Sequence, residues 1–210
     1  MNRLLQGDVG SGKTVVAAAC AYFAWQNGCQ AALMAPTELL AQQHQRTMET
    51  LLAGTGLRVG LLVGSMTAAQ KRDCRAALAA GALDLIVGTH ALLSEGVSFR
   101  RLGLVITDEQ HRFGVDQRAA LAAKSGEKDR PHVLVMSATP IPRTLALMIY
   151  GDLDLSVIDQ LPPGRTPVAT YLIREDKRAR LYAFVRKQVA QGRQVYIVCP
   201  AVDQEDPEGL

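Results

Sequence analysis

The sequence has no long apolar segment and no opening leader, and each absence excludes a class of protein. Its longest strongly apolar helical stretch, residues 15–25, is about half of the roughly 20 residues that a membrane-spanning helix needs. We therefore expect a buried helix there and no membrane contact. No charged leader followed by an apolar core opens the chain, so we expect no secretion signal.

Metal-ligand and disulfide spacings are also lacking. The four cysteines, Cys20, Cys29, Cys74 and Cys199, are scattered along the chain, which favours reduced thiols in a cytoplasmic protein. The net charge is only +3, from 23 basic and 20 acidic residues, too small an excess to indicate nucleic-acid binding by itself. Any case for DNA must therefore come from motifs.

What the sequence does contain is a series of short apolar runs with helix-compatible segments between them. The runs are predominantly apolar and do not alternate with polar residues, as strands covered on both faces require. They lie at residues 3–5, 31–35, 59–63, 83–87, 102–106 and 133–136. Intervening segments such as 38–53 and 68–80 are rich in Ala, Leu and Gln, which favour helices. This alternation predicts an α/β fold with a doubly wound, mainly parallel sheet.

A change of pattern comes at residues 161–167, where three prolines and a glycine cannot continue a helix or a central strand. We predict a linker there, between a first domain at 1–160 and the start of a second at 168–210. After the linker the pattern predicts a strand at 168–173, a helix at 177–190 and a strand at 195–199. Because these elements bury too little surface to be stable alone, we expect the chain to be a piece of a longer protein.

The segment from Gly7 to Thr14 matches the phosphate-binding pattern G-x-x-x-x-G-K-T/S and lies between an apolar strand and a helix, where its mechanism needs it. Main-chain N–H groups and the helix N-terminus would face the phosphates of ATP. Lys13 would reach the β and γ phosphates, and the Thr14 hydroxyl would bind Mg²⁺. The residues expected to bind ATP are Gly7, Asp8, Gly10, Ser11, Gly12, Lys13 and Thr14.

Another apolar strand ends in two acids, Asp108 and Glu109, as in a Walker B segment. Because ligands bind at the carboxyl ends of parallel strands, Asp108 would share a crevice with the phosphate loop and hold Mg²⁺ together with Thr14. Glu109 would orient or deprotonate the attacking water. Lys13, Asp108 and Glu109 are therefore the predicted catalytic residues.

These motifs and their order resemble the superfamily 2 helicases, a DEAD/DEAH-like group. Residues 108–111 resemble the box that names the group, 137–139 its motif III, 35–40 its motif Ia and 87–90 its motif Ib. The resemblance implies contacts with the DNA backbone, which threonine hydroxyls and main-chain N–H groups can make without reading bases. The residues so implied are Pro36, Thr37, Gly88, Thr89 and His90. Those implied to couple hydrolysis to DNA movement are Gln110, His111, Ser137, Ala138, Thr139 and Arg143.

Within the superfamily, residues 3–14 and 162–168 resemble the RecG-type bacterial DNA helicases, whereas 108–115 and 137–144 are shared by RecG helicases and transcription-repair coupling factors. The RecG resemblance covers essentially all 210 residues. It implies a RecA-like P-loop lobe and the start of a second such lobe. The implied function is ATP-dependent translocation on double-stranded DNA that remodels stalled replication forks and Holliday junctions in recombination and repair.

The resemblance also implies a location and further partners. It places the protein in the bacterial cytoplasm, at the nucleoid, and allows contacts with a single-strand-binding protein or other repair proteins through the full-length enzyme. The chain alone is expected to be a weak ATPase, because it stops before the second-lobe arginine that hydrolysis requires. Two alternatives stay open: the helicase module of a transcription-repair coupling factor, and a P-loop ATPase that does not act on DNA.

Overall fold

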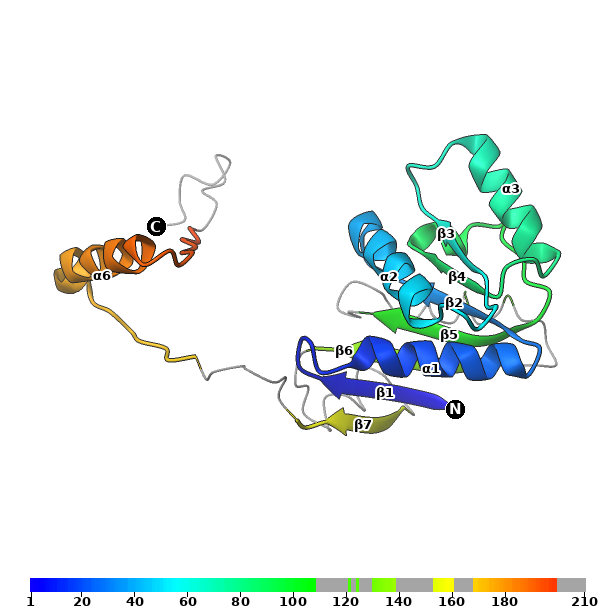
Figure 1. The fold of residues 1–210 in the computed structure, drawn as a ribbon, viewed down its shortest axis with the longest axis horizontal. Coiled ribbons are helices and arrows are strands. Elements are labelled where there is room, and N and C mark those ends of the chain that lie inside the picture. The colour runs from blue at the N-terminus through cyan, green and yellow to red at the C-terminus, as the bar shows by residue number, and fades with distance from the viewer. Residues whose placement is uncertain (109–120, 122–123, 125–129, 139–152, 161–167, 200–210) are drawn as a thin grey trace, which may run out of the picture. The chain divides into compact units, whose positions relative to one another are not determined.

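The computed structural model describes residues 1–108, 121, 124, 130–138, 153–160 and 168–199. By its internal contacts the chain divides into two units, Met1–Arg165 and Thr166–Leu210. The first unit contains a seven-stranded sheet in which each pairing of described strands is parallel. The predicted α/β fold with a doubly wound sheet is therefore confirmed, and Figure 1 shows it from the side on which α1 and α2 lie.

Strands and helices of the first unit follow one another as the apolar pattern predicts. In chain order they are β1 (Asn2–Gly7), α1 (Lys13–Gln26), β2 (Gln30–Met34), α2 (Glu38–Leu51), β3 (Val59–Leu62), α3 (Ala68–Ala79), β4 (Leu85–Gly88), the 3₁₀ helix η1 (His90–Leu93), β5 (Leu102–Asp108), β6 (His132–Ser137) and β7 (Asp154–Ile158). The strands are arranged in space as β3-β4-β2-β5-β6-β1-β7. The strand that leads into the phosphate loop, β1, is thus separated from β5 by β6 alone.

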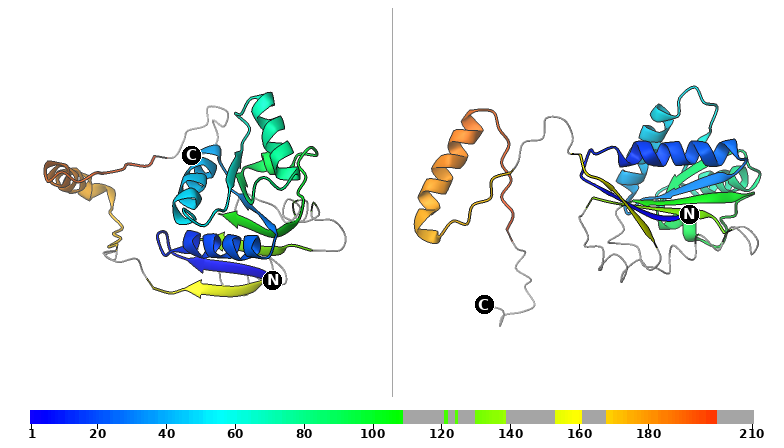
Figure 2. Two further views of the ribbon diagram at one scale, coloured as in Figure 1. Left: turned by 45° about the vertical axis from the view of Figure 1, so that its right-hand side comes forward. Right: turned by 90° about the horizontal axis from the view of Figure 1, so that it is seen from below.

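Helices cover both faces of the sheet, which explains why its central strands are mostly apolar. On one face α1 and α2 pack against a core that includes Leu33 and Ile106. On the other face α3 and η1 pack against a core that includes Met34 and Val105. Successive strand residues point to opposite faces, so neighbours such as Leu33 and Met34 belong to different cores. Figure 2 shows α1 lying along its face of the sheet.

One strand of the sheet, β7, was not expected from the sequence. It pairs with β1 at the edge of the sheet, and each of its residues is exposed or half-buried. Arg3 on β1 joins the two strands by donating to Ser156 Oγ at 2.6 Å and to Asp154 Oδ2 at 3.4 Å. An edge strand with one open face does not need a continuous apolar run, so β7 leaves no apolar signal in the sequence.

The described part of the second unit, residues 168–199, consists of η4 (Glu175–Lys177) and α6 (Arg178–Ala190) with extended chain on either side. The predicted helix is confirmed. The predicted strands at 168–173 and 195–199 are wrong, since neither segment forms a strand and the side chains of Leu172 and Val198 are 101% and 92% exposed. Strands are stable only when their backbone groups pair with neighbours, and these segments have no such partner in the described chain.

Among the described residues, no helix is long and apolar enough to cross a membrane.

Candidate functional site

The predicted motifs are brought together because their strands are parallel and in register. Gln6 of β1 pairs with Ser137 of β6, and Met136 of β6 pairs with Asp108 of β5. Met34 of β2 pairs with Thr107 on one side and with Gly88 of β4 on the other. Adjacent strands lie about 4.8 Å apart, so β1 and β5, separated by one strand, are about 10 Å apart. The carboxyl edge of the sheet therefore holds the phosphate loop, Asp108 and the motif Ia and Ib segments side by side.

The phosphate loop is closed by its own lysine. Lys13 Nζ donates to the carbonyl oxygens of Gly7 and Asp8, each at 2.8 Å. Gly10 and Gly12 have φ angles of 79° and 96°, in the left-handed region that glycine adopts at little cost. The lysine ammonium is thus held across the loop, where a phosphate group would meet it.

Close packing at the start of the loop also requires glycine. A Cβ atom at Gly7 would lie 2.6 Å from Ser11 Oγ and 3.1 Å from Ile158 Cβ. The next residue, Asp8, accepts a hydrogen bond from Val9 N–H at its own Oδ1, at 2.7 Å. The Asp8 side chain and the close packing at Gly7 therefore both help to set the conformation of the loop.

The N-terminus of α1 points its first N–H groups into the loop. Gly12 precedes the helix without a side-chain cap, and the first turn contains no acidic residue. The first helical hydrogen bond, from Val15 N to Gly12 O at 3.0 Å, leaves the N–H groups of Lys13 and Thr14 for a ligand. Ser11 Oγ is buried, with no hydrogen-bond partner among the described residues. Uncapped N–H groups and a positive dipole end suit an anion such as phosphate.

The acid at the end of β5 has a partner that sequence reasoning missed. His44 Nε2 lies 2.6 Å from Asp108 Oδ2, and the two side chains are only 11% and 15% exposed. The one available signal was the position of His44 on α2, whose buried residues are Ala41, His44 and Met48. A titratable side chain on the apolar face of a helix must find a polar partner in the core, and here that partner is the predicted Mg²⁺ ligand.

The hydroxyl of Thr14 and the carboxylate of Asp108 are oxygen ligands of the kind that Mg²⁺ binds. Mg²⁺ is commonly held by one or two carboxylates and the phosphates of a substrate, and it keeps several waters. The described residues contain no cluster of three or more His, Cys, Asp or Glu that could hold a metal by themselves. A hydroxyl beside the loop and one carboxylate two strands away would supply part of a Mg²⁺ site, and nucleotide phosphates and water would supply the rest.

Of the motif Ia residues, Pro36 is half-buried and Thr37 is exposed. Thr37 Oγ1 accepts a hydrogen bond from Leu40 N–H at 3.3 Å and so caps α2. The cap uses only a lone pair of the hydroxyl oxygen, so the hydroxyl hydrogen remains available for another acceptor. Thr37 therefore combines a structural role with a polar group on the surface at this edge.

The motif Ib residues differ among themselves in exposure. Gly88 and Thr89 are buried, and the Thr89 hydroxyl has no partner among the described residues. A Cβ atom at Gly88 would lie 2.3 Å from the carbonyl oxygen of Leu62, so glycine is needed for β3 and β4 to approach. His90, next along the chain, is exposed. At this segment it is His90 that the structure presents to the surface.

The predicted coupling residues are described only in part. Ser137 ends β6 and is 1% exposed, and Ala138 is half-buried beside it. The others of that set, and the predicted catalytic acid Glu109, lie outside the described residues; they are Gln110, His111, Thr139 and Arg143.

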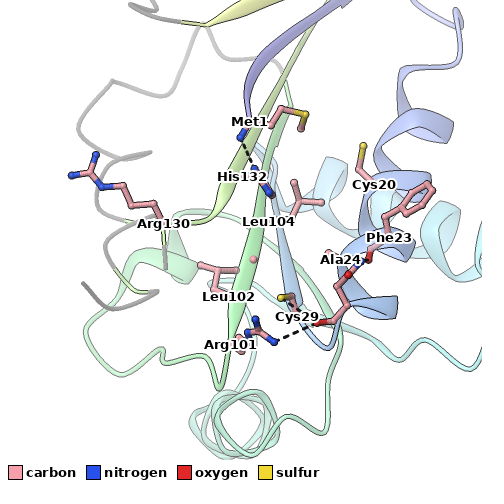
Figure 3. A pocket seen from close by; sticks show the side chains of 12 residues that line it. Met1, Cys20, Phe23, Ala24, Cys29, Arg101, Leu102, Leu104, Arg130 and His132 are labelled. Carbon is pink, nitrogen blue, oxygen red and sulfur yellow. Dashed lines mark hydrogen bonds between the residues drawn. The ribbon is translucent and has the colours of Figure 1, made fainter. Parts of the chain in front are cut away.

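A cavity of about 790 Å³ lies at the opposite edge of the sheet. Its lining includes Leu102 and His132, which begin β5 and β6, together with Phe23 and Arg101. Figure 3 shows these side chains gathered around the amino ends of the strands, with Arg101 donating to a main-chain carbonyl. Because ligands of parallel sheets bind at the carboxyl ends of the strands, this cavity is not the nucleotide site.

Comparison with known proteins agrees with this geometry. The model of the DEAD/DEAH box helicase family matches residues 1–148. The chain belongs to this family. It is 56% identical over 206 residues to the ATP-dependent DNA helicase RecG of Synechocystis sp., covering 98% of this chain and 24% of that protein. It is 51% identical over 206 residues to the RecG of Bacillus subtilis, covering 98% and 30%.

Solved structures give the same result. The chain matches a structure of RecG bound to a three-way DNA junction with a TM-score of 0.74 and 45% identity, over 91% of this chain and 25% of that chain. The helicase domain of Pyrococcus furiosus Hef matches with a TM-score of 0.59 and 20% identity, over 76% of this chain and 35% of that chain, and shares the fold. The chain thus spans between 24% and 30% of the length of the two curated RecG relatives above.

Proposed function

We propose that this chain is the ATP-binding part of an ATP-dependent DNA helicase that moves along double-stranded DNA and remodels branched DNA in recombination and repair. The observation that carries the proposal is the meeting of the phosphate loop, Asp108 and the Thr37 and His90 segments at one edge of the sheet. It is supported by the relatives, which are ATP-dependent DNA helicases, one of them bound to a three-way DNA junction.

The loop residues would bind the triphosphate of ATP. Lys13 would turn its ammonium from the two carbonyls toward the β and γ phosphates, while the first N–H groups of α1 donate to the same oxygens. Thr14 and Asp108 would hold Mg²⁺, which when bound supplies positive charge to the phosphate oxygens. Glu109, next to Asp108, would orient the attacking water.

The DNA-facing part of the site would act on the backbone. Thr37 and His90 are exposed polar side chains of the motif Ia and Ib segments at this edge. Their contacts would be to phosphate oxygens and would carry no base specificity. Thr89 donates its N–H to Leu62 O at 3.4 Å, and it would contribute by fixing the main chain beside His90. A preference for branched DNA would come from shape and not from sequence.

This function gives the protein its location and further partners. An enzyme that acts on chromosomal DNA in bacteria works in the cytoplasm, at the nucleoid. A single-strand-binding protein and other repair proteins are the partners that such an enzyme would meet at a fork.

ATP hydrolysis by the full-length protein tests the proposal. We expect forked DNA to raise the rate above the rate without DNA, and Lys13→Ala to abolish both. Thr37→Ser keeps the cap and the hydroxyl and should behave as the wild type. Thr37→Asp also caps the helix but places a negative charge next to the DNA phosphates. It should therefore lower the stimulation by DNA and leave the rate without DNA unchanged. A wild-type rate that forked DNA leaves unchanged would contradict the proposed function.

A further inference from the structure

The face of α2 that packs on the sheet carries an imidazole. The whole His44 residue, main chain included, is 9% exposed, and along the helix it lies between Ala41 and Met48, which are fully buried. An apolar residue at this position would complete the helix–sheet core. Burying an imidazole among apolar neighbours is unfavourable unless its polar atoms are hydrogen-bonded. The contact with Asp108 supplies a hydrogen-bond partner for the buried imidazole.

The hydrogen bond fixes the orientation of a carboxylate. A carboxylate oxygen only accepts hydrogen bonds, so His44 Nε2 carries the hydrogen and donates to Asp108 Oδ2 at 2.6 Å. Rotation of a carboxylate about its last torsion is otherwise broad. With one oxygen held by His44, rotation of the carboxylate is restricted, and the other oxygen remains for Mg²⁺ or for a water bound to it.

The helix that carries His44 is itself a rigid support. Thr37 caps its N-terminus, and Glu38 Oε1 accepts a hydrogen bond from Ser65 N–H at 3.0 Å, which ties the first turn to the loop after β3. About one turn beyond His44, Met48 is fully buried. A group that orients a metal ligand works only if its own position is locked in this way.

We propose that His44 is a positioning residue for the nucleotide site, holding the carboxylate of Asp108 in the orientation that Mg²⁺–nucleotide requires. The inference rests on the proposed function, in which Asp108 is a Mg²⁺ ligand. His44 does not touch the phosphates or the reacting atoms, and its effect is on the metal-dependent part of nucleotide binding. Residues that orient metal ligands from outside the ligand set typically change metal affinity or activity about 10- to 100-fold when they are replaced.

The test is the Mg²⁺ dependence of ADP binding to the full-length protein, measured with a fluorescent ADP analogue over a Mg²⁺ titration and in excess EDTA. His44→Leu keeps the volume and removes the donor. His44→Gln keeps an amide donor at the end of the side chain, and Gln43→Ala alters the exposed neighbour on the same helix. We expect His44→Leu to need about 10- to 100-fold more Mg²⁺ for half-maximal binding, with wild-type affinity in EDTA. His44→Gln should recover most of the loss, and Gln43→Ala should match the wild type.

Three results would overturn the assignment. An unchanged Mg²⁺ requirement in His44→Leu would show that the hydrogen bond does not matter to the metal. An equal loss of affinity in EDTA would mean that the pocket is damaged as a whole. Failure of His44→Gln to recover binding would exclude hydrogen-bond donation as the cause.

Folding is followed by a melting curve for each variant. If His44→Leu does not fold, His44→Asn, with a shorter amide, takes its place and is expected to show the same raised Mg²⁺ requirement. A wild-type protein that binds ADP equally with and without Mg²⁺ would instead remove the proposed metal site, and this assignment with it.

Discussion

Replacing Lys13 by alanine separates the two roles that the structure gives this side chain. Its ammonium donates to two loop carbonyls, of Gly7 and Asp8. Hydrogen bonds from a charged donor contribute about 1.5–3 kcal/mol each. Because the loop is partly exposed, its carbonyls regain water, so we expect a loss of only about 1–2 kcal/mol of stability in total. That corresponds to a fall of about 2–8 °C in Tm for a domain of this size.

Nucleotide binding should suffer much more. Removing one partner of a hydrogen-bonded charge pair costs about 2–5 kcal/mol, and about 3 kcal/mol is a 100-fold loss of affinity. Mg-ADP affinity and a melting curve are measured on the same sample. Lys71→Ala is the matched control, because Lys71 Nζ also donates to a loop carbonyl, that of Gly64, at 2.6 Å. A Lys13→Ala protein whose affinity stays within a few-fold of the Lys71→Ala protein would refute the assignment.

Three further predictions follow from named contacts. Asp108→Asn should raise the Mg²⁺ concentration needed for nucleotide binding, whereas Glu109→Gln should leave binding nearly intact and slow hydrolysis. Mg²⁺ titrations and single-turnover rates distinguish the two variants. Equal losses of binding would contradict the separate roles of the two acids. Gly88→Ala places a Cβ 2.3 Å from a carbonyl oxygen of β3, so we expect about 1–3 kcal/mol of destabilisation in urea unfolding, and an unchanged midpoint would disprove the close approach. Burial raises the pKa of Asp84, but hydrogen bonds from the Arg58 side chain and N–H outweigh it and leave that pKa below its usual value. Its contribution to stability is then complete above about pH 4 and is lost as pH falls through the folded pKa; Arg58→Ala should therefore reduce the loss of stability on acidification, and an unaltered acid midpoint would count against the pair.

Most of the sheet could be predicted from the sequence because its strands are buried on both faces. The strand β2 has no exposed residue and is apolar from Ala31 to Met34, and such a buried apolar run leaves a local signal in the sequence. The edge strand β7 has no such run and was missed. The segments at 168–173 and 195–199 gave the same signal as true strands, but they form none, because pairing depends on neighbouring strands that local sequence does not supply.

The sequence by itself determined the phosphate loop, because the residues that shape it are local. Gly10 and Gly12 adopt the positive φ angles of the loop, and Lys13 donates back to Gly7 O, six residues earlier. It also determined that Asp108 ends a strand. Only the tertiary structure decided that a single strand separates β1 from β5, and that His44 of α2 lies 2.6 Å from Asp108. The two residues are 64 positions apart. Their contact depends on how α2 packs across the sheet, and long-range packing of this kind is the sum of many weak contacts that no local pattern records.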